Sequence, residues 1–161
     1  MANANKEEQV EFDLDKKVVV KNIAGWTVTF RRLCDIGDVI ITAEGSVKLS
    51  RNEIISQIQN GQTLFTGRNG DGSHPTLFID DAATRLEVGF DKEDGTKQIV
   101  FSDDVITKLF AVKNIETFKK NFKEAIKTRA EKHAAMKAIQ RLGLNDYAKI
   151  RFAEDYTGFR V

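Results

Sequence analysis

The chain has 161 residues, of which 41% are hydrophobic and 30% charged, and this balance excludes wholesale disorder. The length predicts one domain, or one domain with an appended helical arm. Cys34 is the sole cysteine, which excludes an internal disulfide. Apolar runs such as 18–20 and 39–41 are too short to cross a membrane. We therefore expect a cytoplasmic protein with no membrane partner.

The charges are spread unevenly along the chain, although the net charge is only +1. Residues 113–161 carry twelve Lys or Arg against six Asp or Glu, whereas the rest of the chain carries thirteen against eighteen. This asymmetry indicates a polyanionic or acidic partner for the C-terminal part. The alternatives are an ordinary solvated helix face and charge complementarity between two copies of the chain.

The first two-thirds of the chain is rich in strand patterns. Residues 17–23 are densely β-branched, and residues 26–33 alternate apolar and polar side chains. The Ala24-Gly25 turn between these runs predicts a hairpin, and residues 39–43 predict a third strand. Residues 63–66 and 76–79 resemble a strand pair, and residues 90–101 a further hairpin. The candidate core consists of apolar residues of these runs: Trp26, Val28, Phe30, Ile40, Leu64, Phe65, Leu77 and Phe78.

Short helices are predicted between the strands. Ser50 and Glu53 form a capping-box pattern at the start of residues 51–60, and Gly61 follows as a stop signal. A second short helix is expected between residues 80 and 88, and a third from residue 103 to about residue 113.

A long basic helix is predicted over residues 115–142, capped by Asn114 and stopped by Gly143. At ~1.5 Å per residue it would extend roughly 40 Å, more than a small domain can cover. The aromatic segment after it predicts a tail that docks. The expected fold class is α+β, divided into a flexible tail (1–10), a β-rich domain with short covering helices that could close into a barrel (11–112), and the long helix with its aromatic tail (113–161).

A glycine-rich loop between residues 67 and 75 is the most distinctive local feature. Its residues of interest are Gly67, Gly70, Asp71, Gly72 and His74. Glycines let backbone amides face a phosphate, but the residues that follow match neither a phosphate-binding loop nor a dinucleotide fingerprint, and the acidic ligands of a calcium loop are missing. We expect a structural connection between strands, reached through positive φ angles. A small-molecule or phosphate-binding protein built on this loop is the third hypothesis, after an assembly protein and a nucleic-acid-binding module.

Catalytic signals are weak by comparison. His74 lies near Asp71, Asp80 and Asp81 in the sequence and could act as a general base with an orienting carboxylate, but no nucleophile accompanies it. We therefore predict no catalytic residue, no metal site and no cofactor, and expect that replacing His74 leaves the fold and the assembly nearly intact.

The long helix offers two interpretations. Its aromatic residues and its alanine row lie on partly different sides, so one face could pack on the same chain and the other on a partner or a second copy. The predicted partner-binding residues are Phe118, Phe122, Ala130, Ala134 and Ala138. Nucleic-acid binding is the alternative, through aromatic and basic residues of the strand 26–32 and through phosphate contacts from the helix. Its candidate residues are Arg31, Arg32, Lys120, Lys123 and Lys127.

The run from Ser50 to Asp80, SRNEIISQIQNGQTLFTGRNGDGSHPTLFID, resembles small accessory structural proteins of tailed bacteriophages. The resemblance covers about a fifth of the chain, as a succession of helix, glycine loop and strand, and carries over no individual residue. It implies a non-enzymatic structural or assembly protein of a virion or of the host cytoplasm, acting through contacts with copies of itself or with other virion proteins.

Overall fold

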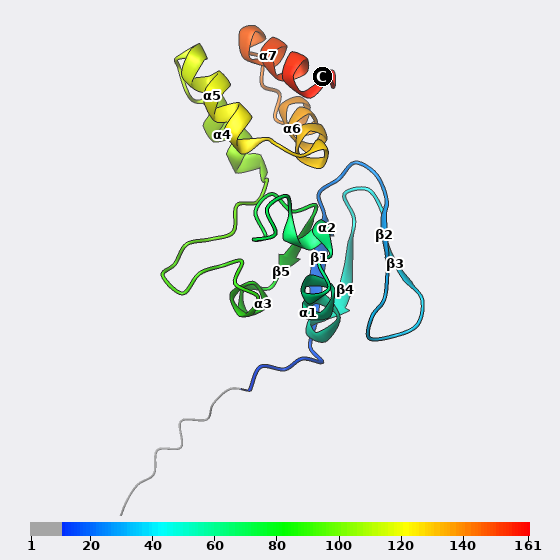
Figure 1. The fold of residues 1–161 in the computed structure, drawn as a ribbon. Helices are drawn as coiled ribbons and strands as arrows, with labels where there is room; N and C mark the ends of the chain where they lie inside the picture. Colours follow the sequence, from blue (N-terminus) through cyan, green and yellow to red (C-terminus); the bar gives the residue numbers. More distant parts are fainter. Residues whose placement is uncertain (1–10) are drawn as a thin grey trace, which may run out of the picture.

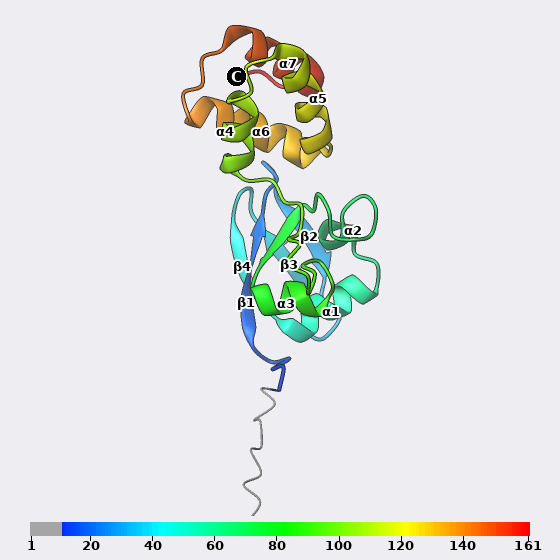
Figure 2. The ribbon, with the colours of Figure 1, turned by 90° about the vertical axis from the view of Figure 1, so that its left-hand side faces the viewer.

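A computed structural model describes residues 11–161, and the predicted tail at 1–10 lies outside the described residues. The described chain is α+β, with seven helices and two small antiparallel sheets. Figures 1 and 2 show two parts, which we call the β body (residues 11–100) and the helical unit (residues 101–161). The five strands between residues 11 and 161 close no barrel, so the barrel expectation is not confirmed.

The larger sheet has β1 (Lys17–Asn22) at its centre, between β4 (Ser46–Ser50) and β5 (Leu77–Asp80). Both pairings are antiparallel, and Val20 lies opposite Val47 on one side and Ile79 on the other. Alternation along β1 sends Val18 and Val20 into the core, as its β-branched run predicts.

The smaller sheet is a hairpin of β2 (Val28–Arg31) and β3 (Asp38–Ile41), in which Phe30 lies opposite Val39. The prediction that 17–23 and 26–33 pair across Ala24-Gly25 is therefore wrong. The reason is that β1 pairs with β4 along one edge and with β5 along the other, which leaves no edge for β2. The amide of Asn22 instead links the end of β1 to the hairpin, donating to the carbonyls of Trp26 and Thr42 (2.8 and 3.1 Å).

Three helices cover the β body: α1 (Arg51–Gln59), α2 (Thr63–Thr66) and α3 (Ala82–Glu87). The hydroxyl of Ser50 accepts the N–H of Glu53 (3.1 Å), as the capping pattern predicts, and Gly61 follows the helix at φ +77°. Residues 63–66 form α2 and not a strand, because a four-residue apolar run does not distinguish the two. Residues 90–101 form no strand pair either. They contain a turn in which the N–H of Lys92 donates to the carbonyl of Thr96 (2.8 Å).

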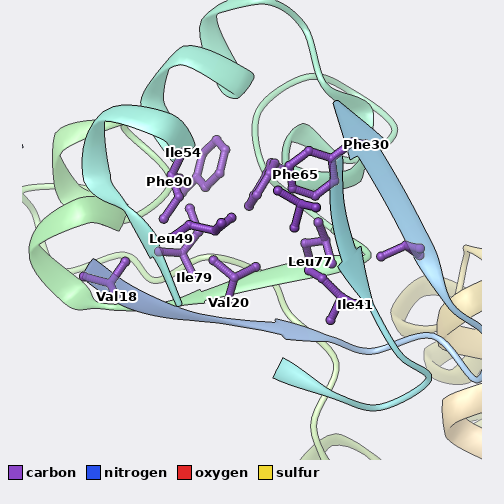
Figure 3. Packing of buried hydrophobic residues seen from close by; sticks show 12 residues of the cluster. Val18, Val20, Phe30, Ile41, Leu49, Ile54, Phe65, Leu77, Ile79 and Phe90 are labelled. Carbon is purple, nitrogen blue, oxygen red and sulfur yellow. The ribbon is translucent and has the colours of Figure 1, made fainter. Parts of the chain in front are cut away.

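The core of the β body lies between the larger sheet, the hairpin and α1–α2 (Figure 3). Phe30 and Phe65 meet edge to face at 5.8 Å in its centre, beside Leu77. Three predicted core residues lie elsewhere, since Trp26 is 37% exposed, Ile40 is 60% exposed, and Phe78 is half-buried on the other face of β5, against Arg85. Ile40 points outward because residues of β3 alternate between the two faces of the hairpin.

The helical unit contains α4 (Asp103–Phe110), α5 (Ile115–Ala125), α6 (Arg129–Arg141) and α7 (Tyr147–Thr157). The single long helix predicted over 115–142 is wrong, because the chain becomes extended at Ile126 and a new helix begins after Thr128. The predicted aromatic tail docks as α7. Phe152 and Tyr156 of α7 contact Phe122 of α5, edge to face, at about 6 Å between ring centres.

Phe30 provides a direct test of the β body's core. Truncation of a buried aromatic residue leaves a cavity, so we expect Phe30→Ala to lower the free energy of unfolding by about 3–5 kcal/mol in urea titrations. Ile99→Ala is the control at an exposed position of the β body outside the hairpin, and it should change the free energy of unfolding by less than about 0.5 kcal/mol. A Phe30→Ala protein as stable as its parent would contradict this core.

Acid stability should depend on Asp91, which is buried and accepts hydrogen bonds from the N–H of Gln98 (2.9 Å) and from Arg85 (3.0 Å). Burial, the largest influence, raises the pKa of this carboxyl group, but the hydrogen bonds and the charge of Arg85 outweigh it and the pKa is lowered. The stability that this group contributes is thus present above the ordinary aspartate pKa of about 3.9 and is lost as the pH falls through the folded-state pKa.

Asp91→Asn should therefore lower the free energy of unfolding near neutral pH and make it less dependent on pH below about 4. Urea titrations over a pH series measure both effects. An acid dependence as steep in the variant as in the parent would show that Asp91 is not the group responsible.

Candidate functional site

The glycine loop has a conformation that its glycines make possible. Gly67 has φ +71°, and a Cβ there would collide with the carbonyl oxygen of Ser73. A Cβ on Gly72 would collide with the ring of Phe90, and the N–H of Gly72 closes the loop on the carbonyl of Thr66 (2.8 Å). The loop is therefore packed against the β body at two points.

Asp71 stabilises the tip of this loop. Its carboxylate accepts the N–H of Ser73 (3.0 Å), and this hydrogen bond holds the pKa of Asp71 below its ordinary value. Gly70 beside it is exposed at φ +77°. Asp71 thus turns toward the loop's own backbone, and the carboxylate that meets His74 comes from another part of the chain.

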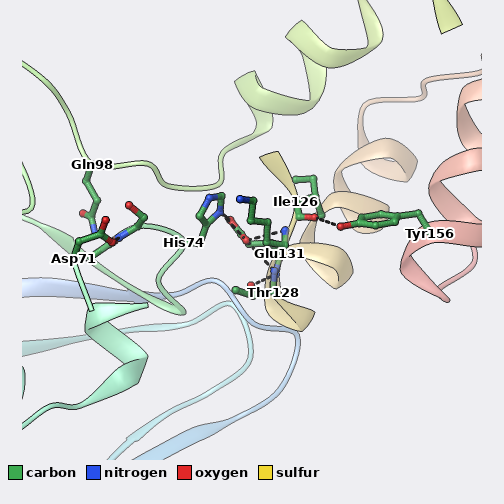
Figure 4. Close-up of polar contacts among 10 residues, drawn as sticks. Asp71, His74, Gln98, Ile126, Thr128, Glu131 and Tyr156 are labelled. Carbon is green, nitrogen blue, oxygen red and sulfur yellow. Dashed lines mark hydrogen bonds and ion pairs between the residues drawn. The ribbon is translucent and has the colours of Figure 1, made fainter. Parts of the chain in front are cut away.

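His74 joins the loop to the helical unit through Glu131 of α6 (Figure 4). The Nδ1 atom of His74 lies 2.7 Å and 3.0 Å from the two carboxylate oxygens of Glu131. Both residues are buried, at 7% and 1% exposure. The backbone of His74 has φ +55°, and its N–H donates to the carbonyl of Ile99 (2.9 Å).

Glu131 also determines where α6 begins. The hydroxyl of Thr128 accepts the N–H of Glu131 (3.1 Å), and Glu131 Oε1 in return accepts the N–H groups of Thr128 (3.1 Å) and Lys127 (3.2 Å). This reciprocal arrangement is a capping box. The same carboxylate therefore ends the continuity of α5 with α6 and binds the glycine loop.

A second contact joins the two parts where Trp26 precedes β2. The rings of Trp26 and His133 meet edge to face at 6.0 Å, and the guanidinium of Arg129 lies 5.6 Å from the centre of the Trp26 ring. His133 lies so close to Gly25 that a Cβ there would collide with the imidazole. Gly25 thus permits the close approach of α6, and no local sequence pattern marks this role.

A cavity of about 370 Å³ opens beside the His74–Glu131 pair. We call it the basic cavity, and its lining residues are Arg68, Asn69, His74, Lys123, Lys127 and Tyr156. The hydroxyl of Tyr156 donates to the carbonyl of Ile126 (2.7 Å), at the break between α5 and α6. The glycine loop, α5, the break and α7 therefore meet at one place.

The predicted site residues are divided between core and surface. The five residues assigned to partner binding (Phe118, Phe122, Ala130, Ala134 and Ala138) are all buried within the chain. Phe118, Phe122 and Ala138 belong to the core of the helical unit. Of the nucleic-acid candidates, Arg31 and Arg32 lie on the hairpin of the β body, whereas Lys120, Lys123 and Lys127 are exposed on the helical unit. Lys123 and Lys127 meet His74 at the basic cavity, and the other three do not line it.

Sequence reasoning missed Glu131, Arg68 and Tyr156. The pattern Thr128-x-x-Glu131 is a recognisable capping box and could have identified the helix start and its acid. No comparable signal marks Arg68 or Tyr156, because both reach the cavity only through the tertiary packing.

Comparison of the chain with protein-family models, curated proteins and solved structures gave no match. Among residues 11–161, no group of three or more His, Cys, Asp or Glu side chains is arranged to hold a metal ion. None of the helices in the described part combines the length and the apolar character needed to cross a membrane.

Burial changes the expectation for His74. Loss of the His74 imidazole would leave the Glu131 carboxylate buried without its side-chain partner. We therefore expect His74→Ala to lower the free energy of unfolding by about 1–3 kcal/mol. Asn69→Ala is the control from the exposed part of the same loop and should stay within about 0.5 kcal/mol of the parent. Chemical unfolding of both variants measures the difference, and equal stability of the two would refute a structural role for the pair.

Proposed function

We propose that this protein is a non-enzymatic structural or assembly protein that acts through protein–protein contacts made by the tip of the β2–β3 hairpin. The observation that supports this is an exposed apolar surface on that hairpin. Ile36 is 95% exposed, Ile40 60% and Leu33 47%. Apolar side chains gathered on one exposed element are typical of interaction sites.

The hairpin tip is held in place before any partner binds. The carboxylate of Glu53 on α1 accepts the N–H groups of Leu33 (3.0 Å) and Cys34 (3.3 Å), and the amide of Gln57 donates to the carbonyl of Arg31 (2.7 Å). A surface that is already ordered loses little conformational entropy on association. This rigidity favours a docking role for the tip.

A second copy of the chain is the partner that we propose. Within residues 11–161, neither β2 nor β3 pairs with a third strand, and only the carbonyls of Arg31 and Ile41, at the ends of the two strands, accept hydrogen bonds from Gln57 and Asn22 side chains. Open edges pair readily with strands of another chain. The resemblance of residues 50–80 to accessory structural proteins of tailed phages supports a virion as the setting of this assembly, with other virion proteins as further partners.

Removal of the apolar tip should abolish self-association. We expect the parent to form a defined oligomer in size-exclusion chromatography with light scattering, and Leu33→Ser with Ile36→Ser to shift its mass to that of a monomer. Because both side chains are substantially exposed, the variant should unfold at nearly the parent temperature.

A matched control is Leu86→Ser with Ile99→Ser, which removes the same two residue types from exposed positions outside the hairpin. The control should keep the oligomer. A monomeric parent, or an oligomer that survives loss of Leu33 and Ile36 side chains, would overturn the proposal that copies of the chain meet at the hairpin.

A further inference from the structure

The basic cavity brings together cations from segments that are far apart in the sequence. Arg68 comes from the glycine loop, Lys123 from α5 and Lys127 from the break before α6. Among residues 11–161, no carboxylate lies within 4.0 Å of any of these three charged groups. Like charges that converge without a counter-charge repel one another, so the arrangement favours an anion between them.

The acidic groups of the neighbourhood do not neutralise the cavity. Glu131 is buried, and its oxygens are occupied by His74 and by the N–H groups of Lys127 and Thr128. Asp71, the carboxylate of the glycine loop, does not line the cavity and accepts the N–H of Ser73. A further cation lies close by, since Lys132 Nζ is 4.8 Å from the centre of the Tyr156 ring that lines the cavity.

The lining residues offer the donors that a phosphate group needs. A guanidinium presents a planar fork that fits two phosphate oxygens, and lysine ammonium groups act as point charges. Asn69 adds an amide. Three cations suit an anion that carries more than one negative charge better than they suit a single carboxylate. The volume of the cavity, about 370 Å³, leaves room for the group that carries the phosphate.

We propose that the basic cavity binds a phosphate-bearing anion. The site is separate from the hairpin tip, and the inference does not rest on the proposed assembly role. The phosphate has two possible sources, a small phosphorylated molecule and a nucleic-acid backbone. Both would present the same oxygens to Arg68, Lys123 and Lys127, so the experiment must include a probe of each kind.

The test compares the full-length parent with Lys123→Gln/Lys127→Gln. Inorganic pyrophosphate is titrated by calorimetry, and a short labelled DNA, single-stranded and duplex, is titrated by fluorescence anisotropy at several salt concentrations. Each charge-assisted hydrogen bond is worth roughly tenfold or more in affinity, so the double variant should bind the effective probe at least about tenfold more weakly.

Lys108→Gln/Lys113→Gln is the matched control, because it removes two exposed lysines of the helical unit that do not line the cavity. It should keep nearly the parent's affinity. Arg68→Gln is a second variant, from the other side of the cavity, that leaves the helices unchanged and should also weaken binding about tenfold or more. Thermal unfolding of each variant verifies that the fold is retained.

The outcomes are decisive in each direction. Pyrophosphate binding that depends on the cavity supports a small phosphorylated ligand, and cavity-dependent DNA binding without pyrophosphate binding supports a nucleic-acid backbone. Equal weakening by the cavity variant and the matched control would reveal a general charge effect and overturn the proposal. Failure of the parent to bind either probe would overturn it as well.

Discussion

The buried carboxylate of Glu131 joins the helical unit to the glycine loop of the β body, beside the contact of Trp26 with His133. A buried charge costs several kcal/mol unless its oxygens are satisfied by well-placed donors. Three donors satisfy it here: His74 Nδ1 and the N–H groups of Lys127 and Thr128. The N–H groups of Lys127 and Thr128 are free only because the helix is broken before Thr128. His74 reaches the carboxylate only because the glycine loop folds toward α6. The helix break and the loop conformation therefore depend on each other.

This coupling explains features that are unfavourable when considered alone. His74 is a non-glycine residue at φ +55°, a conformation that costs free energy and persists where the surroundings impose it. Its hydrogen bonds to Glu131 and to the carbonyl of Ile99 supply that constraint. The break also places Lys127 beside the loop, where it lines the basic cavity together with Lys123. The contact of Glu131 with His74 thus accounts for one of the two joins between the parts and for the cavity beside it.

Local signals predicted local structure well, and tertiary pairing poorly. The caps at Ser50 and Asn114 and the stop at Gly61 were recognisable because each acts within a few residues. The helix break was not recognised, since apolar residues recur at intervals of four through 118, 122, 126, 130, 134 and 138, and both α5 and α6 bury that row. Strand partners were also missed, because β1 pairs with β4 and β5, which lie far from it in the sequence. The cavity draws on the loop and on α5, which no local pattern connects.

The charge asymmetry seen in the sequence is largely preserved in the folded chain. Ion pairs of the helical unit are made within it, as between Arg141 and Asp103 or Arg160 and Glu154. Within residues 11–161, no Lys or Arg pairs with a carboxylate across the two parts, and the hydrogen bond that crosses between them is that of His74 with Glu131. The acidic β body therefore does not neutralise the basic excess of residues 113–161 through direct pairs. An excess that folding leaves uncompensated is free to act on an external anion, and at the basic cavity two of its carriers, Lys123 and Lys127, meet Arg68 of the glycine loop.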